Sequence, residues 1–211
     1  MRLVTAPRTP TRNRRAEILR AAAELFAARG FHGVSIEDIG SAVGVSGPAI
    51  YRHFSGKEAL LSEILIDISE RLREQGARLV TTSAPSPPDG PAGDGPPESA
   101  YATAALDALL RGHIDFALTN PALIRVHERE LDNVPESARR RIRRLQRLYV
   151  EEWVTVLSEL YPTCPPARLR AATHAVFGLL NSTPRSAGEL PPDAMAPLLR
   201  GMAVASLAVL G

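Results

Sequence analysis

The chain has 211 residues, of which 45% are hydrophobic and 23% charged with a formal net charge of +2, so it can bury a core of its own and is too apolar to be disordered. Its single cysteine, Cys164, excludes an internal disulfide and a cysteine-based metal site, and its basic start lacks the apolar run of a signal peptide. The longest apolar stretch, residues 201–211, is shorter than the roughly 20 residues that span a bilayer, so we expect a cytoplasmic protein with no membrane partner.

The charge is unevenly distributed along the chain. Residues 1–57 carry nine Lys and Arg against four Asp and Glu, a net charge of +5, whereas the remaining residues carry 16 against 19, a net charge of −3. A basic end on a slightly acidic body indicates that the first quarter meets a polyanion, although a basic face can also be merely solvated.

Helical periodicity runs through most of the chain, and no alternating β-branched run indicates a strand. The first helix is expected over residues 11–29. Ser35 is a good N-cap for a short helix over residues 36–43, and Gly44 supplies the turn that follows. A second short helix is expected over residues 46–54.

A long helix is then expected from about residue 56 to 80, and the Pro- and Gly-rich residues 84–97 indicate a flexible loop. Five further helices are expected over residues 98–119, 122–132, 135–160, 166–182 and 192–210. The sequence therefore predicts an all-α protein of about nine helices, with a head over residues 1–57 and a body over residues 58–211. The last helix is apolar almost all round, which favours burial against a second subunit.

Two short capped helices joined by a glycine turn form a helix-turn-helix, whose second helix can lie in the major groove of DNA. Helix N-termini offer free N–H groups to phosphate, which suits Ser35 and the start of the long helix near Lys57. Arg52 is long enough for a bidentate contact with guanine. With the basic N-terminal arm included, the candidate DNA contacts are Ser35, Ser46, Gly47, Pro48, Ala49, Tyr51, Arg52, His53, Lys57, Arg12 and Arg15.

These residues form a recognisable pattern: GF at 30–31, SIEDIG at 35–40, AVGVSGPAIYRHF at 42–54 and KEALL at 57–61. The pattern closely resembles the DNA-binding region of TetR-family regulators, and Gly40 departs from it by standing where alanine is usual. The resemblance implies a homodimer that binds a palindromic double-stranded operator, usually as a repressor, and that a small molecule in the C-terminal helices releases. It also implies phosphate contacts from Ser35, Tyr51, His53 and Lys57, and a base-facing surface at Gly47, Pro48 and Arg52.

The body carries no comparable motif, but residues 123–131, 149–157 and 177–184 look similar to a TetR subgroup found near lipid-catabolism operons in actinobacteria. That likeness implies an acyl-CoA or another lipid-like metabolite as the effector. The candidate pocket residues are Phe116, His127, Glu128, Tyr149, Trp153, Phe177 and Asn181, which can also be core or capping residues. The candidate dimer contacts, in a four-helix bundle of the last two helices of each subunit, are Ala175, Gly178, Leu179, Leu199, Met202 and Leu207.

Other functions find less support in the sequence. His113, His127 and His174 lie on three helices without metal-ligand spacing, so neither a metal nor a cofactor is expected. The arginines of residues 139–147 either pair with Glu136 and Glu151 on a solvated face or bind a CoA phosphate. The sequence contains neither a nucleophile elbow nor a phosphate-binding loop, so no motif indicates an enzyme. The alternative is a helical protein–protein interaction module that no longer reads DNA.

Overall fold

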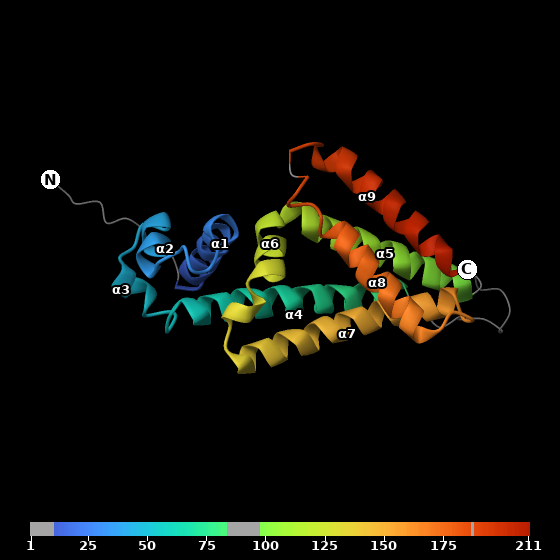
Figure 1. The fold of residues 1–211 in the computed structure, drawn as a ribbon, viewed down its shortest axis with the longest axis horizontal. Helices are drawn as coiled ribbons and strands as arrows, with labels where there is room; N and C mark the ends of the chain where they lie inside the picture. The colour runs from blue at the N-terminus through green and yellow to red at the C-terminus, as the bar shows by residue number, and fades with distance from the viewer. Residues whose placement is uncertain (1–10, 84–97, 187) are drawn as a thin grey trace.

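The computed structural model of the chain describes residues 11–83, 98–186 and 188–211, the side chains of residues 11–13, 83 and 98 excepted. Over these ranges the chain is helical, which confirms the all-α fold class (Figure 1). The helices are α1 (Thr11–Arg29), α2 (Ile36–Ala42), α3 (Gly47–Ile50), α4 (Lys57–Ser83), α5 (Glu98–Thr119), α6 (Pro121–Arg129), α7 (Glu136–Leu160), α8 (Pro166–Leu180) and α9 (Pro192–Leu207), with short 3-10 helices at Leu131–Asn133 and Ala208–Leu210. The expected loop over residues 84–97 lies outside the described residues.

Several helices end a few residues from the position that the sequence predicts, and the local cause is clear for α3 and α6. Helix α3 ends at Ile50 and not near Phe54, because the N–H groups of both His53 and Phe54 turn back to the Ile50 carbonyl oxygen. Helix α6 ends at Arg129, and a 3-10 turn replaces its expected last residues. At both ends the chain continues in a tighter turn than an α-helix makes.

Helix α4 connects the two ends of the molecule. In Figure 1, α1, α2 and α3 form a head at one end, α4 runs from the head beneath the body, and α7 lies alongside it. Helices α5, α8 and α9 make up the far end, where α9 packs against both α5 and α8. Helix α6 lies between the head and the body and packs against α1.

Two groups of buried apolar side chains form the core. The first belongs to the head and the first half of α4, but it also includes Phe116, Ile124, Val126 and Ile142 of α5, α6 and α7. The second fills the body around Trp153, with side chains from α5, α7, α8 and α9. The head is therefore packed against body helices and does not have a core to itself.

Helix α9 corrects the expectation that no segment is long enough to cross a bilayer. Residues Pro192–Leu210 are long and apolar enough by length and composition, because the eleven-residue stretch continues an alanine- and leucine-rich helix. The helix nevertheless carries Asp193 and Arg200, and it buries Leu199 against the rest of the subunit. Only part of this apolar segment is buried in the subunit, and Leu198 and Met202 are exposed on its other side.

Candidate nucleic-acid interface and interior cavity

Helices α2 and α3 are joined by a tight turn. Ser35 caps α2: its Oγ accepts a hydrogen bond from the Asp38 N–H at 3.0 Å, and its own N–H donates to the Asp38 carboxylate at 2.8 Å. The Ser35 hydroxyl also donates to the Asp38 carboxylate at 2.7 Å, and this bond together with that from the Ser35 N–H holds the pKa of Asp38 below its ordinary value. Gly44 has a φ of 69°, which glycine adopts without steric cost. A Cβ at Gly40 would lie 2.7 Å from the Val45 carbonyl oxygen, so glycine permits the close approach of this turn to α2.

The outer surface of α3 and of the turn after it carries most of the predicted base-facing residues. Pro48 and Arg52 are exposed, and Tyr51 is 56% exposed. Gly47 is buried, and a Cβ there would lie 3.1 Å from the Glu37 carboxylate, so this residue faces α2 and not outward. The remaining candidates on this segment are exposed or half-buried: Ser46, Ala49 and His53.

Lys57 holds the first turn of α4 against the connection between α1 and α2. Its Nζ donates to the Phe31 carbonyl oxygen at 2.9 Å and lies 4.5 Å from the centre of the Phe31 ring. A shallow depression beside the N-termini of α2 and α4 is lined by Ser35, Tyr51 and Lys57, together with acidic side chains that include Glu58. The fold thus brings three predicted phosphate contacts from separate segments to one surface, next to the free N–H groups of a helix N-terminus.

Arg15 is engaged inside the head. Its Nε donates to the Glu63 carboxylate at 3.0 Å, and its Nη1 donates to the His53 carbonyl oxygen at 2.7 Å. The guanidinium also lies 4.2 Å from the centre of the Phe54 ring. These contacts join α1 to α4 and to the turn after α3, which gives Arg15 a structural role in this arrangement. The side chain of Arg12 lies outside the described part of the chain.

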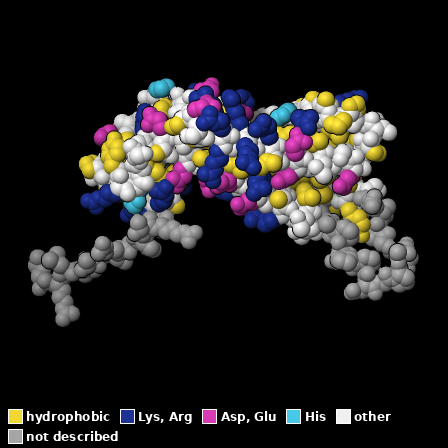
Figure 2. Space-filling model, turned by 90° about the horizontal axis from the view of Figure 1, so that it is seen from below, with side chains coloured by type: hydrophobic (Ala, Val, Ile, Leu, Met, Phe, Trp, Pro, Cys, Tyr) yellow, Lys and Arg dark blue, Asp and Glu magenta, His cyan; other side chains and the backbone are white. Residues whose placement is uncertain are grey.

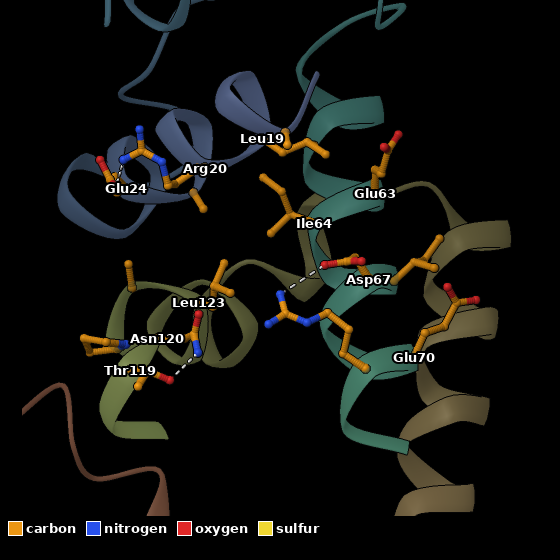
Figure 3. Close-up of a pocket in the computed structure, with 16 residues that line it drawn as sticks. Leu19, Arg20, Glu24, Glu63, Ile64, Asp67, Glu70, Thr119, Asn120 and Leu123 are labelled. Carbon is orange, nitrogen blue, oxygen red and sulfur yellow. Dashed lines mark hydrogen bonds and ion pairs between the residues drawn. The ribbon is translucent and has the colours of Figure 1, made fainter. Parts of the chain in front are cut away.

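A cleft of about 750 Å³ lies between α1, α4 and the start of α6 (Figure 3). Its apolar wall includes Leu19 of α1 and Leu123 of α6. Charged side chains on its rim pair with one another, as Arg71 does with Asp67 at 3.5 Å. The cleft lies at the boundary between the head and the body. None of the predicted pocket residues lines it.

A smaller cavity of about 260 Å³ lies inside the body, where α4, α5, α6, α7 and α8 meet. Four predicted pocket residues line it: His127, Tyr149, Phe177 and Asn181. Four polar residues that were not predicted also line it: Ser69, His113, Gln146 and His174. His113 follows Leu109 and Leu110 on a buried face of α5. A polar residue on an apolar helix face was therefore the sequence signal that could have indicated His113 as a cavity residue.

Three other predicted pocket residues lie elsewhere. Phe116 belongs to the core shared by the head and the body, because α5 turns this side chain toward α4. Glu128 forms an ion pair with Arg185 at 3.3 Å at the surface. Trp153 is fully buried behind the cavity and packs edge-on against Phe177, with 5.1 Å between the ring centres.

His113 is the centre of a hydrogen-bonded network in this cavity. Its Nδ1 lies 3.1 Å from the Tyr149 hydroxyl and its Nε2 lies 3.0 Å from Asn181 Oδ1, while its ring stacks on Phe177 with 4.8 Å between ring centres. Since Asn181 Oδ1 can only accept, Nε2 donates and Nδ1 accepts from Tyr149. Burial lowers the pKa of His113 to about 4 and raises the pKa of Tyr149, so both side chains are uncharged at neutral pH.

The three histidines of the cavity are not arranged as a metal site. His127 has Nε2 at 2.7 Å from the Gln146 amide nitrogen, and burial lowers the pKa of His127. Among the described residues, no group of three His, Cys, Asp or Glu side chains is placed to bind a metal ion.

The outer faces of α8 and α9 expose apolar side chains and leave room for another chain. Leu198 and Met202 are each 48% exposed, and Val209 is 65% exposed. A Cβ added at Gly178 of α8 or at Gly201 of α9 would meet nothing within 4 Å. These side chains and glycines therefore lie at the surface of the described subunit.

The structure corrects two of the predicted interface residues. Leu199 and Leu207 are 4% and 1% exposed and pack inside the subunit's own core. Because this helix is apolar on all sides, the sequence does not show which side faces inward. Leu199 was therefore predicted at the interface, whereas its neighbour Leu198 is the exposed residue. Of the other candidates, Ala175, Gly178 and Met202 are exposed and Leu179 is half-buried.

Two family models match the chain. Residues 18–64 match the model described as bacterial regulatory proteins of the tetR family, and residues 99–207, just over half of the chain, match the model described as a tetracyclin repressor-like C-terminal domain. The transcriptional repressor KstR2 of Mycolicibacterium smegmatis is 34% identical over 80 residues, which cover 37% of this chain and 39% of that protein. The transcriptional activator FasR of the same species is 41% identical over 58 residues, 28% of this chain and 26% of that protein.

Solved structures share the whole fold. A TetR-family regulator from Bordetella parapertussis has a TM-score of 0.74 at 23% identity, covering 90% of this chain and 94% of that one. KstR2 of Mycobacterium tuberculosis has a TM-score of 0.73 at 18% identity, covering 97% of both chains. AibR, solved in complex with isovaleryl coenzyme A and operator DNA, has a TM-score of 0.69 at 20% identity and covers 90% of this chain and 97% of its own.

Proposed function

Because this chain belongs to the TetR family of bacterial regulatory proteins, we propose that it is a DNA-binding transcriptional regulator, acting in the cytoplasm as a ligand-responsive repressor. The observation that carries the proposal is the surface formed by Ser35, Tyr51 and Lys57 beside exposed Arg52. The fragment matched in the repressor KstR2 includes only part of that protein, so repression and its release are proposals for this chain.

The recognition surface reads DNA through two kinds of contact. Tyr51 and Lys57 bind phosphate together with the N-terminus of α4, and these contacts fix the orientation of the head. Arg52 and Pro48 face the base edges, where a bidentate arginine contact with guanine is worth about 1–3 kcal/mol of discrimination.

The operator is a palindrome bound by a homodimer. Exposed Leu198 and Met202 on α9, together with the open faces at Gly178 and Gly201, are the surface that a second copy covers. A twofold dimer presents two recognition surfaces to two half-sites about one DNA turn apart, roughly 34–36 Å.

A small molecule in the cavity of about 260 Å³ is proposed to release the operator. Helix α6 supports such coupling, because His127 and Ile124 line the cavity while α6 packs against α1 of the head. The ligand must prefer the form of the dimer that does not bind DNA. This preference must be roughly 5.5 kcal/mol to change the ratio of the DNA-binding form to the other form from 99:1 to 1:99. AibR binds isovaleryl coenzyme A, and an acyl-CoA is proposed here as the effector class.

The test is a mobility shift of the DNA upstream of the gene at several salt concentrations, with a DNA of scrambled sequence as the control. The expected result is preferential binding whose log K falls with log salt by about 0.9 for each phosphate that the protein neutralises. A flat salt response without sequence preference would instead favour a protein–protein interaction module.

A further inference from the structure

A groove of about 610 Å³ runs along the outer surface of α7 and α8 and is lined by five arginines. Figure 2, which looks at the molecule from below Figure 1, shows Lys and Arg side chains gathered across the middle of this face. Three of the five, Arg143, Arg144 and Arg147, lie within two turns of α7 and are exposed.

Acidic neighbours do not neutralise these three arginines. Among the described residues Arg143, Arg144 and Arg147 have no ion-pair or hydrogen-bond partner, whereas the nearby acid Glu151 is held by Arg170 at 2.7 Å. The pKa of Glu151 is lowered by that bond, so the acid stays charged and committed to Arg170. This part of α7 is therefore not a solvent-exposed face on which acidic residues pair with the arginines.

The groove adjoins the histidine cavity. Gln146, Val150 and His174 line both of them, so the two parts lie side by side and within reach of the two ends of one elongated ligand. The two parts differ in chemistry, since the network of His113 and Tyr149 leaves the cavity uncharged while the groove is strongly basic. The cavity, at about 260 Å³, is smaller than the roughly 300–1,000 Å³ of sites that enclose a whole drug-sized ligand.

We propose that the groove and the cavity form one two-part effector site, in which Arg143, Arg144 and Arg147 bind a phosphate-bearing moiety and the cavity takes a compact uncharged apolar group joined to it. Guanidinium groups suit this role because they bind phosphate oxygens through paired N–H donors. The inference rests on the proposed function, and it specifies how the effector is held.

The test measures ligand binding to the full chain by isothermal titration calorimetry. The probes are isovaleryl-CoA, CoA, the uncharged thioester S-isovaleryl-N-acetylcysteamine, and dihexanoyl phosphatidic acid as a second source of phosphate on an apolar group. At least one phosphate-bearing apolar probe should bind the wild-type chain, and it should bind at least about tenfold more tightly than the uncharged thioester. Whichever of isovaleryl-CoA and the phosphatidic acid binds identifies the source of the phosphate.

A triple variant tests the arginines directly. R143Q/R144Q/R147Q should weaken the phosphate-bearing probe by about tenfold or more and leave the uncharged thioester within about twofold. The matched control R78Q/R111Q/R185Q removes the same charge from residues that do not line the groove, and should keep wild-type affinity. Thermal melting and operator binding of both triple variants should stay as in the wild type.

Three outcomes would overturn the inference. These are equal loss of affinity in the two triple variants, equal affinity of the wild-type chain for charged and uncharged probes, and no binding of either phosphate-bearing apolar probe. The proposed function fails in another way, through the absence of operator binding by the ligand-free protein. The two failures are therefore distinguishable.

Discussion

Tyr51 and Lys57 face the same depression but are held in different ways. Tyr51 projects from the turn after α3, and among the described residues it has no hydrogen-bond partner. Lys57 is fixed by the Phe31 carbonyl oxygen and the Phe31 ring. Only Lys57 therefore holds the head together, in addition to the phosphate contact that we propose for both residues.

Substitution should separate these two roles. Tyr51→Ala should weaken operator binding about tenfold without lowering the melting temperature, since the only contact that we propose for this side chain is with phosphate. Lys57→Ala should weaken operator binding and also lower the free energy of unfolding by about 1 kcal/mol, because it removes the bond to Phe31. Mobility shift and thermal denaturation measure both effects, and an unchanged melting temperature in Lys57→Ala would contradict the structural role.

Burial of His113 makes stability depend on pH. The pKa of this residue falls from its ordinary value of 6.5 to about 4 in the folded chain, so between these values the unfolded chain binds more protons. Stability is therefore full above pH 6.5 and is lost as the pH falls toward 4, by up to about 3 kcal/mol.

His113→Gln should remove most of this loss, although it lowers stability at neutral pH through the lost stacking on Phe177. The measurement is chemical denaturation between pH 7 and 4, with His32→Gln, an exposed histidine of the head, as the control that keeps the wild-type slope. Burial raises the pKa of Glu152 to about 7 and so gives an opposite slope, but it does so in all three proteins and cancels in the comparison. Equal slopes for the wild type and His113→Gln would refute the assignment.

At the scale of the elements, the helix-turn-helix depends on close backbone approach at Gly40. A Cβ at this position would lie 2.7 Å from the Val45 carbonyl oxygen and 3.3 Å from the Gly47 nitrogen. Both neighbours are backbone atoms, so they cannot rotate away as a side chain could.

Gly40→Ala should destabilise the head by about 1–3 kcal/mol, because the turn must move outward to admit the methyl group. The shift should also misplace α3 and weaken operator binding. Ser41→Ala on the exposed face of the same helix is the matched control and should leave both properties near wild type. Unchanged stability of Gly40→Ala would mean that the turn opens at little cost.

Most elements were predictable because their ends are marked by local chemistry. Ser35 with Asp38, and Gly30 and Gly44 at positive φ, fix helix ends by rules that act within a few residues. The cavity was only partly predictable, since His113 and His174 lie far apart in sequence and meet through the packing of α5 and α8. Tertiary packing, which no local rule encodes, decides such juxtapositions.

For the whole molecule, the exposed apolar face of α8, α9 and the 3-10 helix that follows is the surface through which we propose that two copies assemble. Leu198, Met202 and Val209 expose apolar surface that a second copy would remove from water. The sequence predicted that these helices form the interface, but the side of α9 that faces outward became clear only once Leu199 and Leu207 were seen inside the subunit.

Leu198→Glu combined with Met202→Glu should convert the proposed dimer into a monomer, because each subunit would bury two charges without partners in the interface. Light scattering after size exclusion measures the mass, and operator affinity should fall with it since each monomer reaches one half-site. Leu148→Glu on α7, 43% exposed, is the control that should leave the mass unchanged. A double variant that stays dimeric would place the interface elsewhere.

The first core group joins the head to α4, α6 and the start of α7, and this limits how the protein can be re-engineered. Leu60, Leu61 and Leu65 belong to the same core group as Phe26 and Ile39. A fragment ending at residue 57 would lack these three leucines and would expose the core side chains of the head to water. A chimera designed to change DNA specificity should therefore replace only the exposed residues of α3. Otherwise it should transfer the whole head with the first half of α4 and the α6 residues that pack against them.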